Sequence, residues 1–321
     1  MTRLEPARLP TMYFIGVTTG KSMIMRVFPK WARHLGLGRC RIRGIDLAPH
    51  DESARYRAVV SFIKNDPLSL GALVTTHKID LLRASRDLFD DLDEFAALMG
   101  EASSISKAGG RLRAGAKDPI TSGLALDDFL PPGTWKASGA HAFVIGAGGS
   151  SIALVSHIAG REHGADRPAR LVVSNRSPGR LAEMRDINAR QGFDLPIEYV
   201  PTPRPEDNDA VMRTLPPGSL AVNATGLGKD APGSPITDAA PFPERGYAWD
   251  FNYRGDLVFL AQARRQAPAL GLHVEDGWLY FIHGWLAVIA EVFHRDIPVS
   301  GPAFEELCAI AACERSPECA E

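Results

Sequence analysis

A glycine-rich segment near the middle of the chain has the residue types of a phosphate-binding turn. The apolar residues 142–145 predict a buried strand, and the glycines after them allow a tight turn into a helix. Gly146 permits the turn, while Gly148 and Gly149 let backbone N–H groups approach a pyrophosphate at the helix N-terminus. The predicted phosphate site consists of Gly146, Ala147, Gly148, Gly149 and Ser150.

The next predicted strand, residues 170–174, ends in Asn175, Arg176 and Ser177. A dinucleotide-binding domain that prefers NAD carries an acidic residue at this tip, where it holds the ribose 2′-hydroxyl. An acid would repel a 2′-phosphate, whereas an arginine can bind one through two parallel hydrogen bonds. Ser177 and Pro178 suit the start of a helix, whose amides would meet the same phosphate. These residues predict NADP rather than NAD; the alternative is that Arg176 is an ordinary exposed loop arginine.

Three further side chains could act on a substrate. Lys78 lies just past the strand predicted at 71–75, Asp118 just before a helix, and Tyr253 just past another strand. Ligands of α/β sheets bind at the carboxyl ends of the strands, so we expect all three groups near a substrate. The simpler alternatives are an exposed lysine, a carboxylate that caps the helix, and a tyrosine that packs at a domain edge.

These residues need a framework of alternating strands and helices, which is typical of parallel sheets covered on both faces. In the first part we predict strands at 12–18, 41–46 and 71–75, helices at 26–35, 53–64 and 122–130, and a hairpin of 103–106 with 111–114. In the second part we predict strands at 142–145, 170–174, 197–200, 219–223 and 247–251, a long apolar helix after Glu275 and a helix at 302–313. Pro131-Pro132-Gly133 predicts a linker, 161–168 a surface loop and 316–321 a disordered tail.

The composition excludes several classes of partner. The 321 residues are 45% hydrophobic and 23% charged, with a net charge of −2, so nothing favours nucleic acid or an acidic membrane. The apolar residues 12–17 are too few for a secretory signal, and no uncharged apolar run reaches the roughly 18 residues of a membrane span. The cysteines form no C-x-x-C pair, so we expect no metal site but free thiols in a reducing cytoplasm. They are Cys40, Cys308, Cys313 and Cys319.

Seven segments, in order along the chain, resemble motifs of the shikimate/quinate dehydrogenase family. G-x-N-V-T-x-P-x-K resembles Gly71–Lys78, with one residue fewer, G-A-x-N-T resembles Gly100–Ser104, and N-T-D-x-x-G resembles Ala116–Gly123, with two residues inserted. G-A-G-G-A-x-x-A matches Gly146–Ala153, N-R-T matches Asn175–Ser177, N-A-T matches Asn223–Thr225, and D-x-x-Y matches Asp250–Tyr253. The resemblance runs from Gly16 to about Ala287, and it implies that Asn223, Ala224 and Thr225 join the NADP site.

The resemblance also implies a catalytic dyad of Lys78 and Asp118 at the hydroxyl group that becomes a carbonyl. Hydride leaves a carbinol carbon only as the O–H proton is removed, and a lysine with a pKa near 10.4 is a poor base at pH 7. Desolvation and the positive nicotinamide ring would lower the pKa of Lys78. Asp118 would oppose that shift, so we expect it to orient the lysine and to hydrogen-bond the substrate.

The substrate-recognition residues depart from the family pattern. The family binds a carboxylate with two serines in H-S-x-S-P; here Ser22 keeps the first, while Ile24 replaces the second and Met25 the proline. Ser103 stands in place of an asparagine, and a glutamine of the late helix falls at Gly284. Lys21 could be a replacement anion anchor or a solvated side chain, and His283 could reach the pocket or lie in the packing between helices. The predicted substrate-binding set is Lys21, Ser22, Thr75, Ser103, Tyr253 and His283.

We therefore predict an α/β fold with an N-terminal α/β substrate domain (1–130), a Rossmann NADP-binding domain (131–275) and C-terminal helices (276–321) that return to the first domain. The predicted function is an NADP-dependent oxidoreductase of a small polyhydroxylated, anionic substrate, in a cytoplasmic monomer or homodimer. One alternative is a genuine shikimate or quinate dehydrogenase. Another is a non-catalytic NADP-binding regulator, which would have no need of Lys78 and Asp118.

Overall fold

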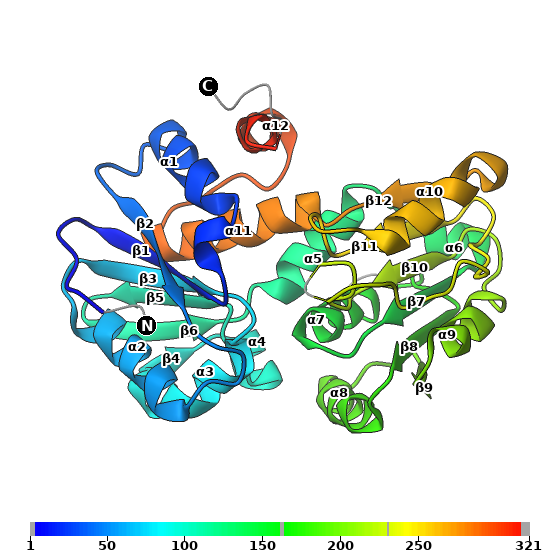
Figure 1. Ribbon diagram of the computed structural model, residues 1–321, viewed down its shortest axis with the longest axis horizontal. Helices are drawn as coiled ribbons and strands as arrows, with labels where there is room; N and C mark the ends of the chain where they lie inside the picture. Colours follow the sequence, from blue (N-terminus) through cyan, green and yellow to red (C-terminus); the bar gives the residue numbers. More distant parts are fainter. Residues whose placement is uncertain (1–3, 161–163, 230, 316–321) are drawn as a thin grey trace. The chain divides into compact units, whose positions relative to one another are not determined.

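The chain divides into two compact units, each built on its own sheet (Figure 1). The computed structural model describes residues 4–160, 164–229 and 231–315. Unit 1 comprises residues 1–117 and 282–321, and unit 2 comprises residues 118–281. The predicted tail 316–321, with Cys319, lies outside the described residues, as do residues 161–163 of the predicted surface loop.

Unit 1 contains a six-stranded mixed sheet in the order β2-β1-β3-β5-β6-β4. The first three strands run parallel, as alternation of strands and helices predicts, and β5 and β6 form the predicted antiparallel hairpin. The strands are β1 (Thr11–Gly16), β2 (Arg41–Asp46), β3 (Ser69–Val74), β4 (Asp91–Leu92), β5 (Ser104–Ala108) and β6 (Arg111–Gly115). The ends of β1, β2, β3 and β6 and the start of β5 therefore share one edge.

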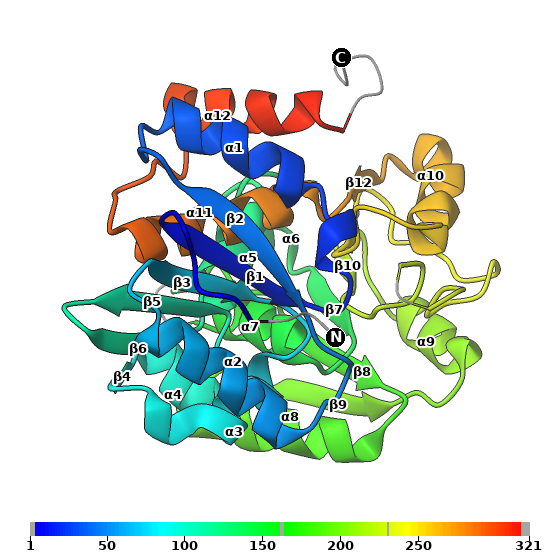
Figure 2. The ribbon, with the colours of Figure 1, turned by 60° about the vertical axis from the view of Figure 1, so that its left-hand side comes forward.

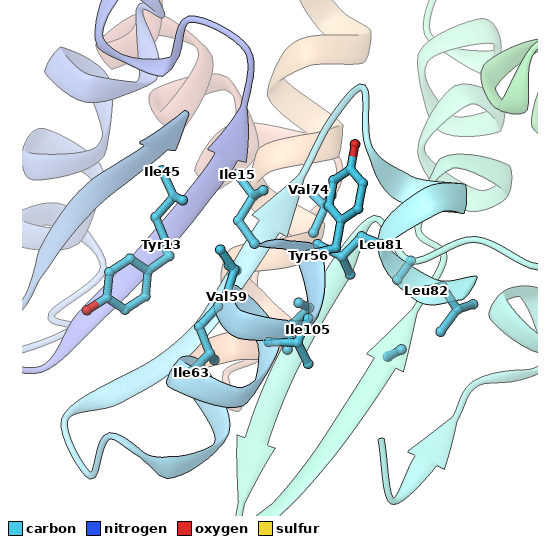
Figure 3. Close-up of a cluster of buried hydrophobic side chains, with 14 of the residues drawn as sticks. Tyr13, Ile15, Ile45, Tyr56, Val59, Ile63, Val74, Leu81, Leu82 and Ile105 are labelled. Atoms are coloured by element: carbon cyan, nitrogen blue, oxygen red, sulfur yellow. The ribbon is translucent and has the colours of Figure 1, made fainter. Parts of the chain in front are cut away.

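Helices cover both faces of this sheet. Figure 3 shows one core cluster, which contains Tyr13 and Ile15 of β1, Val59 and Ile63 of one helix and Leu81 of another. The helices of unit 1 are α1 (Ile24–His34), α2 (Ser53–Asn65), α3 (Lys78–Ser85), α4 (Glu94–Met99), α12 (Gly301–Cys313) and most of α11 (Trp278–Phe293).

The C-terminal helices return to unit 1, as predicted. Helix α12 lies beside α1 in both ribbon views (Figures 1 and 2), and the indole N–H of Trp31 donates to the carbonyl of Leu307 at 2.9 Å. Glu314 forms ion pairs with Arg26 at 2.9 Å and with Lys30 at 2.5 Å. Apolar packing and a few charged contacts thus join sequence segments nearly 300 residues apart.

Unit 2 contains an all-parallel six-stranded sheet in the order β12-β11-β10-β7-β8-β9. In sequence order this is the Rossmann arrangement, in which the strand order reverses between the first strand and the fourth. The strands are β7 (His141–Ile145), β8 (Arg170–Asn175), β9 (Ile197–Pro201), β10 (Leu220–Asn223), β11 (Tyr247–Asp250) and β12 (His273–Glu275). The reversal falls between β7 and β10.

The helices of unit 2 pack on both faces of this sheet. They are α5 (Asp118–Asp127), α6 (Thr134–Ser138), α7 (Gly149–Ile158), α8 (Pro178–Gln191), α9 (Pro205–Met212) and α10 (Val258–Leu270). Helix α5 packs closely on α7, and a side chain at Gly123 would lie 2.3 Å from the ring of His157. This contact explains why unit 1 ends at Lys117, not near residue 130, and why α5 groups with unit 2.

Most predicted elements are present with shifted ends. Helix α5 begins at Asp118 rather than at residue 122, because Pro119 suits the first turn of a helix and starts it there. Helices α3, α4 and α6 and strands β4 and β12 were not predicted, since each is short. No helix among the described residues is both long and apolar enough to cross a membrane.

We predict that Gly71→Ala destabilises the protein, because a methyl group there would lie 2.1 Å from the backbone oxygen of Ile105. Gly71 also has a φ of +149°, which L side chains rarely adopt. The expected loss is about 2 kcal/mol or more, seen as a melting temperature lower by several degrees. The matched control is Gly284→Ala, inside α11 with no atom within 4 Å, which should be neutral or slightly stabilising. Equal melting temperatures for the two variants would contradict the prediction.

Candidate functional site

The glycine turn lies where the strand order of unit 2 reverses. Gly146 has a φ of +121°, and a side chain there would lie 2.8 Å from the carbonyl oxygen of Ala224. The amide of Ala224 donates to the carbonyl of Ile145 at 2.9 Å. The end of β7 and the end of β10 therefore meet, and they bring the turn beside Asn223, Ala224 and Thr225.

Helix α7 starts directly after this turn, with Gly148 as its N-cap. A side chain added at Gly148 would meet no atom within 4 Å, so the space beside this residue is open. The hydroxyl of Ser150, in the first turn, lies 3.4 Å from the carboxylate of Asp118. Asp118 is 8% exposed and begins α5. The structure thus places the predicted catalytic carboxylate beside the predicted phosphate turn.

The tip of β8 presents a basic side chain to solvent. Arg176 is exposed and takes part in no hydrogen bond, ion pair or ring contact with the residues that the structure describes. Ser177 is the N-cap of α8 and Pro178 its first residue, as predicted. Arg180 lies in the first turn of the same helix, where it pairs with Glu183 at 2.6 Å. Arg180 was not among the predicted cofactor residues, although its place four residues after Arg176 puts a second arginine near the tip of β8.

A buried polar network lies behind the N-A-T segment. Asp250, at the end of β11, accepts hydrogen bonds from the side-chain amide of Asn223 at 3.1 Å and from that of Asn252 at 2.8 Å. The side-chain oxygen of Asn223 in turn accepts from the backbone and the hydroxyl of Thr225, at 3.1 and 2.6 Å. Burial raises the pKa of Asp250 to about 7, although these hydrogen bonds and Lys229 oppose the shift. The residues that shape the N-A-T loop are therefore held by a group that titrates near neutrality.

The predicted substrate residues of unit 1 gather at the edge where β1 and β3 end. Lys21 and Ser22 follow β1 and end a short 3₁₀ helix, Thr19–Lys21. Thr19 fixes this helix, because its amide and hydroxyl donate to Asp46 at 2.8 and 2.5 Å. The side chain of Lys21 is exposed and makes no contact of these kinds with described residues, whereas Ser22 is half-buried.

Lys78 begins α3, directly after the end of β3. Its half-buried side chain projects from a helix start that Thr75 supports, since the amide of Lys78 donates to the carbonyl of Thr75 at 3.1 Å. Thr75 itself hydrogen-bonds the carbonyl of Ile15 through its amide, at 3.0 Å, and through its hydroxyl, at 3.3 Å. These contacts tie the lysine to the two central parallel strands.

The hydroxyl of Ser103 makes its hydrogen bonds within the protein. It is 3% exposed, and its hydroxyl oxygen accepts from the amide of Lys117 at 2.7 Å. Asp93 reinforces the same segment, since it accepts from the amide of Ala116 at 3.1 Å and pairs with the Lys117 ammonium at 3.3 Å. Asp93 also caps α4 by accepting from the amide of Ala96 at 2.8 Å. Ser103 and Asp93 therefore fix the chain just ahead of Asp118.

The two remaining predicted substrate residues, Tyr253 and His283, each lie against an aromatic ring. His283 is 2% exposed and stacks on Phe304 with 4.5 Å between ring centroids. Tyr253 is half-buried and lies against Phe281 at 4.7 Å. Ile24 is fully buried on the inner face of α1. Substrate contact by His283, Tyr253 and Ser103 stays a prediction.

The candidate residues fall into one set in each unit. Unit 2 brings together the glycine turn, the N-A-T loop and Asp118, and it presents Arg176 at the tip of β8, next to β7 in the sheet. Unit 1 brings together the 3₁₀ helix, Thr75, Lys78 and Ser103. Lys78 and Asp118 belong to different units, so their action as a dyad stays a prediction. Among the described residues, no three histidine, cysteine or acidic side chains are arranged to hold a metal ion.

We predict that Asp250 makes the stability of the protein fall as pH rises. Its pKa is about 7 in the folded state against 3.8 ordinarily, so its favourable contribution is complete below about pH 4 and is lost as pH rises through about 7. Asp250→Asn removes this titration. The unfolding free energy of the wild type minus that of the variant, measured by urea denaturation, should therefore fall by a few kcal/mol, at roughly 1.4 per pH unit, between about pH 4 and 8. The control Asp186→Asn, on exposed α8 surface, should keep the wild-type pH dependence. Parallel curves for the wild type and Asp250→Asn would rule this out.

The curated proteins that are similar in sequence to this chain carry one name, shikimate dehydrogenase (NADP(+)). No protein-family model matches the chain. The chain is 31% identical over 185 residues to the shikimate dehydrogenase (NADP(+)) of Rhodopseudomonas palustris strain CGA009, a match that covers 56% of this chain and 60% of that protein. It is 25% identical over 298 residues to the shikimate dehydrogenase (NADP(+)) of Sphingopyxis alaskensis, covering 92% and 95%. The chain spans less than two thirds of the length of the first curated relatives, between 54% and 60%.

Solved structures share the fold. The shikimate 5-dehydrogenase of Thermus thermophilus, in complex with NADP(H) and shikimate, matches with a TM-score of 0.67 and 23% identity, over 94% of this chain and all of that one. The quinate dehydrogenase of Corynebacterium glutamicum, in complex with NAD, matches with a TM-score of 0.68 and 19% identity, over 94% and 98%. The 5-ketofructose reductase of a Gluconobacter strain matches with a TM-score of 0.65 and 15% identity, over 94% and 98%. The chain is thus similar in sequence to shikimate dehydrogenases (NADP(+)), and it shares its fold with a shikimate and a quinate dehydrogenase of known structure.

Proposed function

We propose that the protein is an NADP-dependent oxidoreductase that interconverts a secondary alcohol and a ketone on a small polyhydroxylated, anionic substrate. The observation that carries the proposal is the glycine turn at the strand-order reversal, next to a strand tip that ends in Arg176. The names of the relatives, shikimate dehydrogenase (NADP(+)), support the same class of reaction.

The residues of unit 2 fit such a cofactor. The open space beside Gly148 and the first amides of α7 suit a pyrophosphate. Arg176 has its guanidinium available for a 2′-phosphate, and the start of α8 adds further amides. Bound NADP would supply the hydride acceptor or donor. No acidic side chain occupies the tip of β8, which favours NADP over NAD.

The proton transfer falls to Lys78 in this proposal. In ketone reduction the Lys78 ammonium donates a proton to the carbonyl oxygen as that oxygen gains negative charge, and in alcohol oxidation the amine takes the hydroxyl proton. Asp118 accepts a hydrogen bond from the substrate or the lysine and holds the reacting oxygen in place. Within unit 2, the hydroxyl of Ser150 lies 3.4 Å from this carboxylate.

The substrate end differs from that of a standard shikimate dehydrogenase. Ile24 is inside the core and offers no hydrogen bond, and the hydroxyl of Ser103 already has two partners within the protein. Ser22 and the exposed ammonium of Lys21 are polar groups near the start of α1. These groups suit an anionic substrate other than shikimate. The fold match to a 5-ketofructose reductase shows that this fold is also found in a reductase of that name.

We predict that Arg176→Ala weakens NADPH binding tenfold or more and leaves NADH binding nearly unchanged. The variant loses a charge-assisted contact to the 2′-phosphate, worth about 1.5–3 kcal/mol. Fluorescence titration of both cofactors measures the effect. Arg190→Ala, at the other end of α8, is the matched control and should bind NADPH as the wild type does. If the wild type bound the two cofactors equally well, the assignment of Arg176 would be wrong.

We predict that shikimate and quinate are poor substrates and that a different polyol acid is a good one. A screen of NADP⁺ reduction over polyol acids, sugar acids and cyclitols should find kcat/KM for shikimate well below roughly 10⁴ M⁻¹s⁻¹, the lower end for efficient enzymes.

Lys78→Ala should lower the rate on the best substrate by 10²–10⁴-fold, because the variant loses the group that transfers the proton. The control Lys136→Ala, which removes an exposed lysine of α6, should not change the rate.

Efficient turnover of shikimate would instead favour a genuine shikimate dehydrogenase. NADP binding with no turnover of any substrate in the screen would favour a non-catalytic regulator. A Lys78→Ala variant with more than a tenth of the wild-type rate would remove Lys78 from the mechanism.

A further inference from the structure

Glu101 is a buried acidic residue in the segment that runs along the start of α3. It is 1% exposed, and it lies between the left-handed C-cap of α4, Gly100, and the start of β5. The next amide, that of Ala102, donates to the carbonyl of Lys78 at 3.1 Å. One backbone hydrogen bond therefore joins the segment of Glu101 to the proposed catalytic lysine. The matching family pattern, G-A-x-N-T, has alanine at this position, so the carboxyl group is a feature of this chain.

A carboxylate in this position needs a positive partner. Removing an ionised carboxylate from water costs several kcal/mol unless a counter-charge and hydrogen bonds replace the solvent. Lys78 is the cation whose backbone contacts this segment, and its half-buried side chain starts within reach of a glutamate.

The other charged groups around the start of α3 are engaged elsewhere. On α3 itself, Asp80 pairs with His50 at 2.9 Å and lies 3.8 Å from Arg83. In the loop before α2, Asp51 lies 3.6 Å from Arg55. His77 is buried against Tyr56 of α2, and burial lowers its pKa, so it is neutral at pH 7.

The ammonium of Lys117, whose amide donates to Ser103, is shared between Asp93 at 3.3 Å and Glu291 of α11 at 3.0 Å. Just after α3, Asp87 pairs with Arg57 of α2 at 2.5 Å. Each of these groups already has a partner of opposite charge or is neutral. The backbone contact between the two segments therefore makes Lys78 the cation best placed to neutralise Glu101.

We propose that Glu101 is the counter-ion of Lys78 and a positioning residue for its amine. The pairing itself is argued from local contacts, and only the catalytic role of Lys78 rests on the proposed function. A nearby carboxylate favours the protonated amine, because opposite charges within about 4–6 Å stabilise each other. A lysine kept protonated is a better proton donor to a carbonyl than a proton acceptor from an alcohol. Glu101 therefore biases the site toward ketone reduction at neutral pH.

The proposal is tested on the lysine itself, without a substrate. The full-length protein is treated briefly with acetic anhydride at pH values from about 7 to 11, and acetylation of Lys78 is measured by peptide mass spectrometry. Only the neutral amine reacts, so the pH dependence gives the pKa of Lys78. In Glu101→Gln this pKa should fall by about one unit or more, which makes acetylation near pH 8 about tenfold faster.

Two further variants keep the result interpretable. Glu101→Ala restores the residue of the family pattern and should show the same shift, even if the glutamine variant folds poorly. Glu94→Gln removes an exposed charge on the neighbouring α4 and should leave the titration of Lys78 unchanged. An unchanged Lys78 titration in a folded Glu101 variant would overturn the proposal. Because this measurement needs no turnover, it can fail or succeed independently of the substrate screen.

Once a substrate is known, the pH profile provides a second measurement. In Glu101→Gln the pH above which kcat/KM for ketone reduction declines should move down by the same amount as the acetylation curve. Loss of activity with no shift of the profile would mean that Glu101 only supports the local structure.

Discussion

The Gly146 turn and the carbonyl of Ala224 approach each other closely. This contact sets the geometry of the predicted cofactor site in unit 2, which we call the cofactor end. It is possible only because residue 146 has no side chain and can adopt a positive φ. The contact lies where neighbouring strands lead to helices on opposite faces, which leaves a crevice at the strand ends in sheets of this kind. The first turn of α7, the N-A-T loop and Asp118 are all placed relative to this one contact.

The cofactor end could be predicted from the sequence because its determinants are local. A strand, a glycine turn and a helix are contiguous in the chain, and the same is true of β8, Ser177 and Pro178. The hairpin and the parallel alternation of unit 1 followed from local patterns too. The start of α5 was missed by four residues, although Pro119 carried the signal.

The substrate end could not be predicted in the same way, because its contacts join distant residues. Nothing in the sequence around Ser103 shows that its hydroxyl is taken by an amide 14 residues later. The pairing of Asp250 with Asn223 spans 27 residues, and the ion pair of Lys117 with Glu291 joins the segment after β6 to helix α11. Departures from a family pattern indicate that recognition has changed, but only three-dimensional contacts show which polar groups are still available.

The contacts of Asp93 limit which amino acids can replace it. One oxygen of its side chain accepts from two amides, Ala96 and Ala116, and the other meets the Lys117 ammonium. Asparagine could serve the amides but not the ammonium, and glutamate, one methylene longer, would no longer reach both amides from the cap position. The position is therefore closed to both of its nearest chemical substitutes. New substrate preferences would have to arise at more permissive positions, such as Lys21, whose side chain no contact with the described residues restrains.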